Sequence, residues 1–154
     1  ASMWRRRLRL EAAALGEVRF SWWVHSTLPG TDVGAPGRSD SPAAVLFAFD
    51  GDHARLPARE RAMFDLAETL SGERPPFATL MYVFGHDGAE RDAVIVHPRT
   101  QRVRKIVLDA GPEHVGHWRE HRRHLARDFE RAFGEPPGPL LSVAYMTDAD
   151  NTQQ

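Results

Sequence analysis

The longest uninterrupted apolar stretch of this chain runs only from Ala43 to Phe49. A helix that crosses a bilayer needs about 20 apolar residues, so this stretch is too short to be one. It is rich in residues that favour strands, and a short continuous apolar run is typical of a strand covered on both faces. We therefore expect a buried strand here, and no membrane span anywhere in the chain.

In the segment from Val18 to His25, apolar residues at the even positions alternate with mostly polar residues at the odd positions. This period of two predicts a strand. This alternation places Trp22 and Trp23 on opposite faces, so the two rings cannot both point into the core. One of them is expected to be exposed or covered by a loop. Further strands are predicted at about 77–84, 93–97, 102–108 and 140–146, and the turn-like residues 98–101 predict a hairpin.

Two helices are predicted, at about 57–70 and 115–133. Pro57 suits a first helical turn, apolar residues recur at helical spacing in both segments, and Gly134 follows the second one directly. Strands outnumber helices, and they do not alternate with helices along the chain. The sequence therefore predicts a mainly β protein, an antiparallel β-sandwich of the jelly-roll type with two inserted helices.

Composition narrows the possible partners. The chain has 154 residues, a formal net charge of −1 and no cysteine, which excludes disulfides and cysteine-based zinc sites. A length of this order predicts a single domain, 1–154. The basic residues Arg99, Arg102, Arg104 and Lys105 are interpreted as a solvated sheet edge, because no exposed aromatic residues are interleaved with them. No nucleic-acid partner is expected.

The final strand-like run leads into an acidic cluster that contains Asp148, Asp150 and Asn151. Oxygen ligands of this kind bind calcium, which makes Asp148 and Asp150 candidate calcium ligands. The complete EF-hand loop also needs a glycine and a distal glutamate, which the chain does not supply here. We favour a loop capped by its own side chains, with calcium as the only cofactor considered and no other expected.

Four histidines, His114, His117, His121 and His124, fall on one face of the helix predicted at 115–133. Paired imidazoles one helical turn apart can bind zinc or nickel. The arginines between them repel a cation, and the order of residues found in helical zinc proteases is missing. A solvated polar face is the favoured interpretation.

Aromatic residues suggest a different kind of site. Trp22, Trp23, Tyr82 and Trp118 could form a platform on which a sugar ring stacks, while core packing is the ordinary role of such rings. The sequence contains no Gly-x-Ser-x-Gly elbow, no glycine-rich phosphate loop and no dinucleotide fingerprint. These observations favour a binding module over an enzyme.

Several stretches that follow one another along the chain carry a family resemblance. They are Phe20–Val24, Asp40–Asp50, Thr79–Val83, Pro98–Arg104, Trp118–Gly134 and Met146–Thr152. On these stretches, which extend from about Leu8 to the end, the chain resembles the bacterial domain-of-unknown-function family 3047. The resemblance implies a galactose-binding-like β-sandwich, similar to carbohydrate-binding modules and to an assembly-factor domain of respiratory complex I. It also implies a periplasmic or exported location, with the cytoplasm as the alternative, and no established activity.

The chain departs from the family pattern at its end and in the helix histidines, which are not part of that pattern. The pattern continues into a further strand, whereas this chain stops at Gln154. We therefore expect a domain that lacks the family's final strand and leaves a sheet edge open after Met146.

Three functional hypotheses follow. The first is a non-catalytic module that binds a glycan or another hydroxylated ligand at the bacterial envelope. Its expected binding residues are Trp22, Trp23, Tyr82, Asp148, Asp150 and Asn151. The second is an assembly domain that recruits a protein partner or a second copy through the open edge of the last strand. The third is a hydrolase or lyase acting on a polysaccharide through Asp148, Asp150 and His97.

Overall fold

The structure is a computed structural model that describes residues 2–26, 41–97 and 100–148, and this part of the chain is mainly β. The strands are β1 (Ser2–Leu10), β2 (Glu17–Trp23), β3 (Ser41–Phe49), β4 (Ala78–Gly85), β5 (Val94–Val96), β6 (Val103–Ala110), β7 (Trp118–His124) and β8 (Leu140–Asp148). The α-helices are α1 (Ala58–Ser71) and α2 (Leu125–Phe133), and short 3-10 turns lie at Ala12–Ala14, His53–Arg55 and Pro112–His114.

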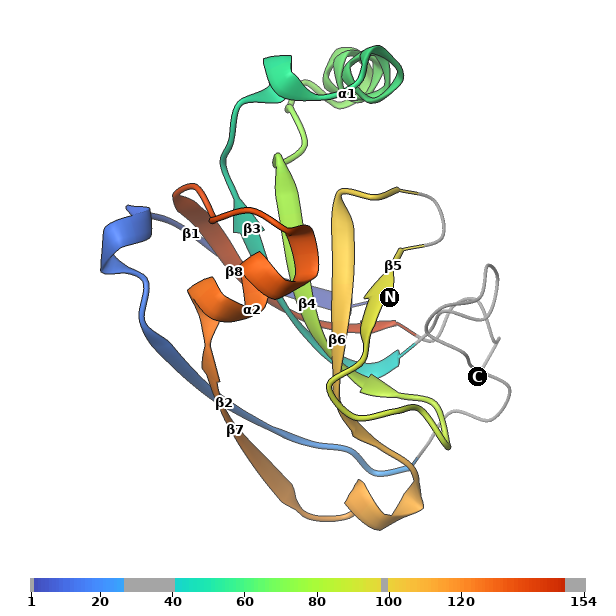
Figure 1. Ribbon diagram of the computed structural model, residues 1–154. Helices are drawn as coiled ribbons and strands as arrows, with labels where there is room; N and C mark the ends of the chain where they lie inside the picture. Colours follow the sequence, from blue (N-terminus) through green and yellow to red (C-terminus); the bar gives the residue numbers. More distant parts are fainter. Residues whose placement is uncertain (1, 27–40, 98–99, 149–154) are drawn as a thin grey trace.

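Six strands form one large sheet in the order β1-β8-β3-β4-β6-β5 (Figure 1). All neighbours run antiparallel except β4 and β6, which are parallel, so the fully antiparallel sheet that we expected is wrong at this point. The reason is that β5 forms the outer edge and β6 returns into the position between β4 and β5. The predicted hairpin is confirmed, because β5 and β6 pair antiparallel.

The last strand, β8, lies inside the large sheet and not at an edge. It pairs antiparallel with β1 on one side and with β3 on the other. The open edge expected after Met146 is therefore wrong for the described residues. The start of the chain, which carries Arg5, Arg6 and Arg7, was not predicted to be a strand. It forms the edge strand β1, which pairs with β8 and covers its edge.

Strands β2 and β7 form a second, two-stranded sheet, and β7 replaces the first half of the helix predicted at 115–133. Only Leu125–Phe133 is helical, and it ends at Gly134 in the left-handed conformation, φ 77°. The four histidines consequently do not share a helix face, and the expectation that they do is wrong. Residues 118–124 adopt a strand because their alternate basic side chains point inward, where they meet carboxylates of other elements.

The core lies between one face of the large sheet and a cover made of the small sheet and α2 (Figure 1). Phe20 of β2 packs on Tyr82 of β4 with ring centroids 5.4 Å apart, and Phe49 of β3 packs on Phe129 of α2 at 4.7 Å. The predicted alternation of β2 is confirmed: Trp22 is buried, whereas Trp23 is 45% exposed. Two sheets thus share one core, with a small sheet facing a large one.

Helix α1 forms where it was predicted, but only Phe64 of its large apolar residues joins the core. Phe64 is the buried residue of this helix, whereas Met63, Leu66 and Leu70 are 51%, 59% and 79% exposed. Figure 1 shows the reason, because α1 projects beyond the end of the large sheet and only one side of it reaches the body of the protein.

The basic residues of β6 and Arg102, which directly precedes this strand, do not form a solvated edge, which corrects a further expectation. Lys105 is 3% exposed, and Arg102 donates from Nε to the Phe77 carbonyl at 2.9 Å while its guanidinium lies 4.4 Å from the centre of the Phe77 ring. Strand β6 lies between β4 and β5, so it is an inner strand and not an edge of the sheet. Arg99 lies outside the described residues.

A close backbone approach at Gly138 gives a test of the fold. A Cβ atom at this position would overlap the carbonyl oxygen of Asp50, whose amide donates to the Pro139 carbonyl at 2.8 Å. We expect Gly138→Ala to lower the free energy of unfolding by roughly 1–3 kcal/mol, measured by urea denaturation. Gly16→Ala is the control, because a Cβ there meets nothing within 4 Å. Equal stability of the two variants would contradict the close approach.

Candidate functional site

The Asp109 carboxylate, at the end of β6, joins the two sheets. Its Oδ2 accepts hydrogen bonds from Trp22 Nε1 at 2.7 Å and from His121 Nε2 at 2.8 Å. Its Oδ1 accepts from Nε and Nη2 of Arg119 at 3.1 Å and 2.9 Å. Strands β2, β6 and β7 therefore meet on one side chain, and all four bonds are charge-assisted at the acceptor.

Burial and hydrogen bonding act on Asp109 in opposite directions. The residue is 1% exposed, and burial alone would raise the pKa of its carboxyl. The hydrogen bonds from His121, Arg119 and Trp22 prevail and hold the pKa well below its ordinary value. The carboxyl is consequently ionised at neutral pH, and the charge is compensated by its donors.

A second buried carboxylate, Asp128 of α2, fixes the other end of β7. Tyr82 donates its hydroxyl to Asp128 Oδ2 at 2.7 Å, and Arg123 donates from Nε to the same oxygen at 2.8 Å and from Nη2 to Oδ1 at 3.0 Å. Burial and the neighbouring Asp128 raise the pKa of Tyr82, so its hydroxyl remains a donor. Arg123 also reaches Asp92 at 3.0 Å.

These contacts decide what two of the predicted binding residues do. Trp22 is 6% exposed and Tyr82 is fully buried, and both use their polar atoms inside the protein. Neither ring is available to a ligand that approaches from solvent. Their role in this structure is to pack the core and to anchor the small sheet.

The outer face of the small sheet is different, because Trp23 and Trp118 lie directly opposite each other there. Their exposed fractions are 45% and 68%, and the ring of Trp23 lies 5.9 Å from that of His25. The side chains of Arg119, His121 and Arg123 point inward from β7. The residues that alternate with them on this strand therefore point outward. We call this outer surface of β2 and β7 the Trp23–Trp118 face.

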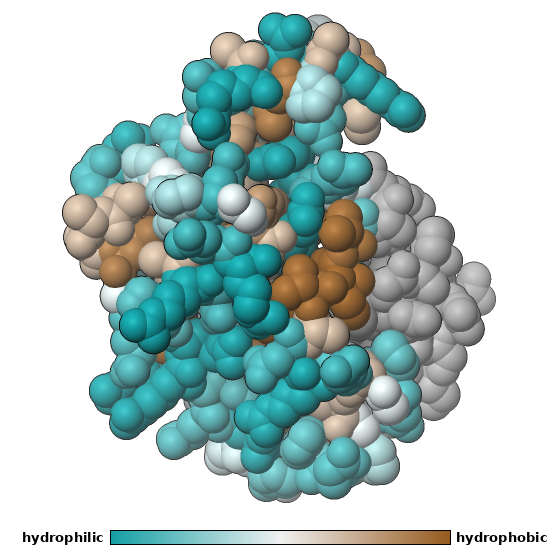
Figure 2. Space-filling view, viewed as in Figure 1, coloured by the Kyte–Doolittle hydropathy of each residue, from teal (hydrophilic) through white to brown (hydrophobic). Residues whose placement is uncertain are grey.

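Polar side chains continue the Trp23–Trp118 face along the strands. Ser21 lies opposite Glu120, and Arg19 lies opposite Arg122. A hollow of about 280 Å³ opens beside them, lined by Arg19, Phe20, Ser21, Glu120, His121 and Arg122. Figure 2 shows the region of β2 and β7 as mainly hydrophilic. The Trp23–Trp118 pair ends the register of the two strands, beyond these polar pairs.

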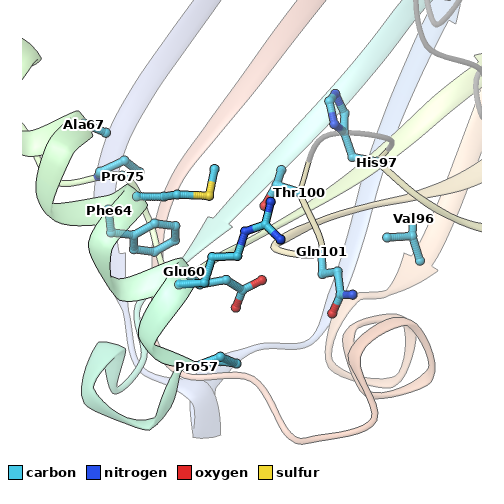
Figure 3. A pocket seen from close by; sticks show the side chains of 11 residues that line it. Pro57, Glu60, Phe64, Ala67, Pro75, Val96, His97, Thr100 and Gln101 are labelled. Atoms are coloured by element: carbon cyan, nitrogen blue, oxygen red, sulfur yellow. The ribbon is translucent and has the colours of Figure 1, made fainter.

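A further hollow lies between α1 and the residues that follow β5, and has a volume of about 700 Å³ (Figure 3). Its apolar lining comes from Pro57, Met63, Phe64, Ala67, Pro75 and Val96. Its polar lining comes from Arg59, Glu60, His97, Thr100 and Gln101. The volume is in the range of small-molecule sites. Its lining residues Thr100 and Gln101 precede β6, whereas Asp109 lies near the other end of this strand.

The remaining predicted site residues are placed only in part. Asp148 is the last residue of β8 and pairs with Ser41, whereas Asp150 and Asn151 lie outside the described residues. The calcium site and the catalytic combination with His97 therefore stay predictions. In the ranges 2–26, 41–97 and 100–148, no group of three or more His, Asp or Glu residues is arranged to hold a metal ion. No helix of this part of the chain is long and apolar enough to cross a membrane.

Comparison with known families decides the relationship that the sequence suggested. A model of the family described as "Protein of unknown function (DUF3047)" matches residues 1–154. The chain belongs to this family. The match extends over the whole sequence and confirms the predicted membership. No curated protein and no solved structure matches the chain.

The predicted binding residues did not include those that organise the site, namely Asp109, Arg119, Arg123 and Asp128. The inward residues of β7 are all basic, but Arg122 and His124 are basic too, so the sequence has no clear period of two here. The pairing of β7 with β2 fixes which of them face inward. The helical spacing of Trp118, Leu125 and Phe129 favoured a helix instead.

Replacing Asp109 tests the anchor of the small sheet. Asp109→Asn removes a buried charge and leaves Arg119 without its partner, which we expect to lower the free energy of unfolding at neutral pH by about 3–5 kcal/mol. The pKa of Asp109 is lower in the folded than in the unfolded state. Its contribution is therefore fully present above the ordinary value near 3.8 and is lost as the pH falls toward the folded value.

The difference between wild type and Asp109→Asn should thus shrink when urea unfolding is repeated near pH 3. Asp87→Asn, at an exposed carboxylate, is the matched control and should change stability by less than about 0.5 kcal/mol. If the difference in the free energy of unfolding between wild type and Asp109→Asn does not change with pH, Asp109 is not an ionised anchor.

Proposed function

We propose that the protein is a non-catalytic β module that binds a glycan on the Trp23–Trp118 face. The observation that carries this proposal is the pair of exposed indole rings lying directly opposite each other on one small sheet. Removing a large aromatic side chain from water lowers the free energy, so two neighbouring exposed tryptophans are typical of a binding surface.

The chemistry of the face suits a sugar. A pyranose ring has an apolar side formed by its C–H groups, which stacks on an indole ring, and a rim of hydroxyls that needs hydrogen-bond partners. Ser21, Glu120 and His25 lie on the same surface and supply donors and acceptors for hydroxyls. An aromatic platform with a few polar groups thus matches both parts of the ligand.

The buried anchors support binding through rigidity. The Asp109 and Asp128 contacts hold the inner side chains of β7, so the backbone that carries Trp118 is fixed before any ligand arrives. A preorganised surface loses less conformational entropy on binding than a mobile one. A stacking platform built on a strand therefore gains affinity from contacts that lie on the opposite face of the same strand.

This proposal changes the binding residues expected from the sequence. Trp23 is retained, and Trp118 takes the place of the buried Trp22 and Tyr82. Asp148, Asp150 and Asn151 remain a separate prediction, with calcium as their possible ion. The suggested galactose-binding-like relationship and a location at the bacterial envelope are parts of the proposal.

The two tryptophans give the direct test. We expect Trp118→Ala, and separately Trp23→Ala, to weaken retention in native gels that contain soluble polysaccharides by about tenfold or more, because each removes one stacking surface. Both side chains are exposed, so the variants should unfold at the same urea concentration as wild type. Trp4→Ala is the matched control, because Trp4 is 60% exposed and lies on β1.

Two outcomes would overturn the proposal. One is the absence of retention of wild type by every polysaccharide of a broad neutral and acidic panel and by a glycan array. The other is retention that Trp4→Ala weakens as much as Trp118→Ala does.

A further inference from the structure

Helix α1 carries a stripe of largely exposed side chains, whose first two members also border the hollow between α1 and the residues that follow β5. Arg59, Met63, Leu66 and Leu70 follow one another at intervals of four, three and four residues, which places them along one side of the helix. The three apolar members are more than half exposed. We call these four residues the α1 stripe.

The spacing of the α1 stripe is that of a coiled-coil seam, in which two helices pack along apolar residues repeated every 3.5 positions on average. The intervals between its four residues, four, three and four, are the same from either end of the helix. If a second copy of α1 lies antiparallel on the first, Met63 meets Leu66 of the partner, Leu66 meets the partner's Met63, and the overlap includes the whole helix. The stripe is therefore complementary to itself, as an interface with twofold symmetry requires.

Charge favours the same arrangement. In the antiparallel pair, Arg59 lies beside Leu70 of the partner, at the C-terminal end of that helix. The last turn of α1 contains no basic residue, and Arg74, which follows the helix, pairs with the side chains of Asp65 and Glu68. The partial negative charge at this end of the helix is therefore not matched by a cation of its own last turn. Arg59 of a second copy supplies that cation. In a parallel pair, by contrast, the two Arg59 side chains would face each other.

We propose that two copies of this chain associate through α1, packed antiparallel along the α1 stripe. Helix α1 projects beyond the end of the large sheet (Figure 1). A helix of 14 residues is about 21 Å long, which is short for a stable interface, so the association is weak and depends on concentration. The dimer presents two Trp23–Trp118 faces, which raises the avidity for a polymer with repeated sites.

The sign of a charge at position 70 tests the register. Leu70→Lys and Leu70→Glu both remove the same exposed leucine, but in the antiparallel dimer the lysine faces Arg59 of the partner and the glutamate pairs with it. We expect Leu70→Glu to associate about tenfold more tightly than Leu70→Lys at low salt, measured by sedimentation equilibrium over a range of concentrations. The double variant Arg59→Glu, Leu70→Lys should restore the association lost in Leu70→Lys.

Controls keep the test specific. Met3→Lys places a lysine at an apolar residue that is 57% exposed on β1 and should leave the association unchanged. Urea unfolding of each variant confirms that the fold is intact, because Leu70 is 79% exposed and contributes little to the core. A wild-type chain that stays monomeric at all concentrations overturns the proposal. Equal association of Leu70→Lys and Leu70→Glu overturns it as well.

Discussion

The arrangement of this protein depends on one buried carboxylate, that of Asp109. It accepts hydrogen bonds from a tryptophan of β2 and from an arginine and a histidine of β7, and so it fixes the small sheet on the large one. A buried charge is tolerated only when it is fully compensated, and here both carboxylate oxygens have donors. Removing Asp109 would take away the acceptor that Trp22, His121 and Arg119 share, so the contact between the two sheets depends on this one side chain.

The consequence for function lies on the opposite side of the same strand. Because Arg119, His121 and Arg123 are held inward by Asp109 and Asp128, the alternate residues of β7 must face solvent. Trp118 is therefore exposed, and the pairing of β7 with β2 brings Trp23 next to it. The exposed aromatic pair is thus produced by a polar interface beneath it, and not by a local preference of tryptophan for the surface.

Much of the fold could be predicted from local sequence patterns. The alternation of β2, the buried strand β3, the β5–β6 hairpin and helix α1 all form near the expected residues. Of the candidate site, the opposite placement of Trp22 and Trp23 was predicted, because a period of two fixes the face of each residue whatever the rest of the protein does. The platform itself was not, because the choice of Trp118 over Tyr82 as the second ring depends on which strand lies beside β2.

The sequence by itself determined that the segments of β2, β3, β4, β5, β6 and β8 are extended, where α1 forms, and the family to which the chain belongs. Only the tertiary structure decided that residues 118–124 form a strand, that β8 lies inside the sheet, and that the apolar stripe of α1 faces solvent. The physical reason is the same in each case. The deciding partners are distant in sequence, as Trp22 is from Asp109 and β1 is from β8, and local periodicity carries no information about contacts of that range.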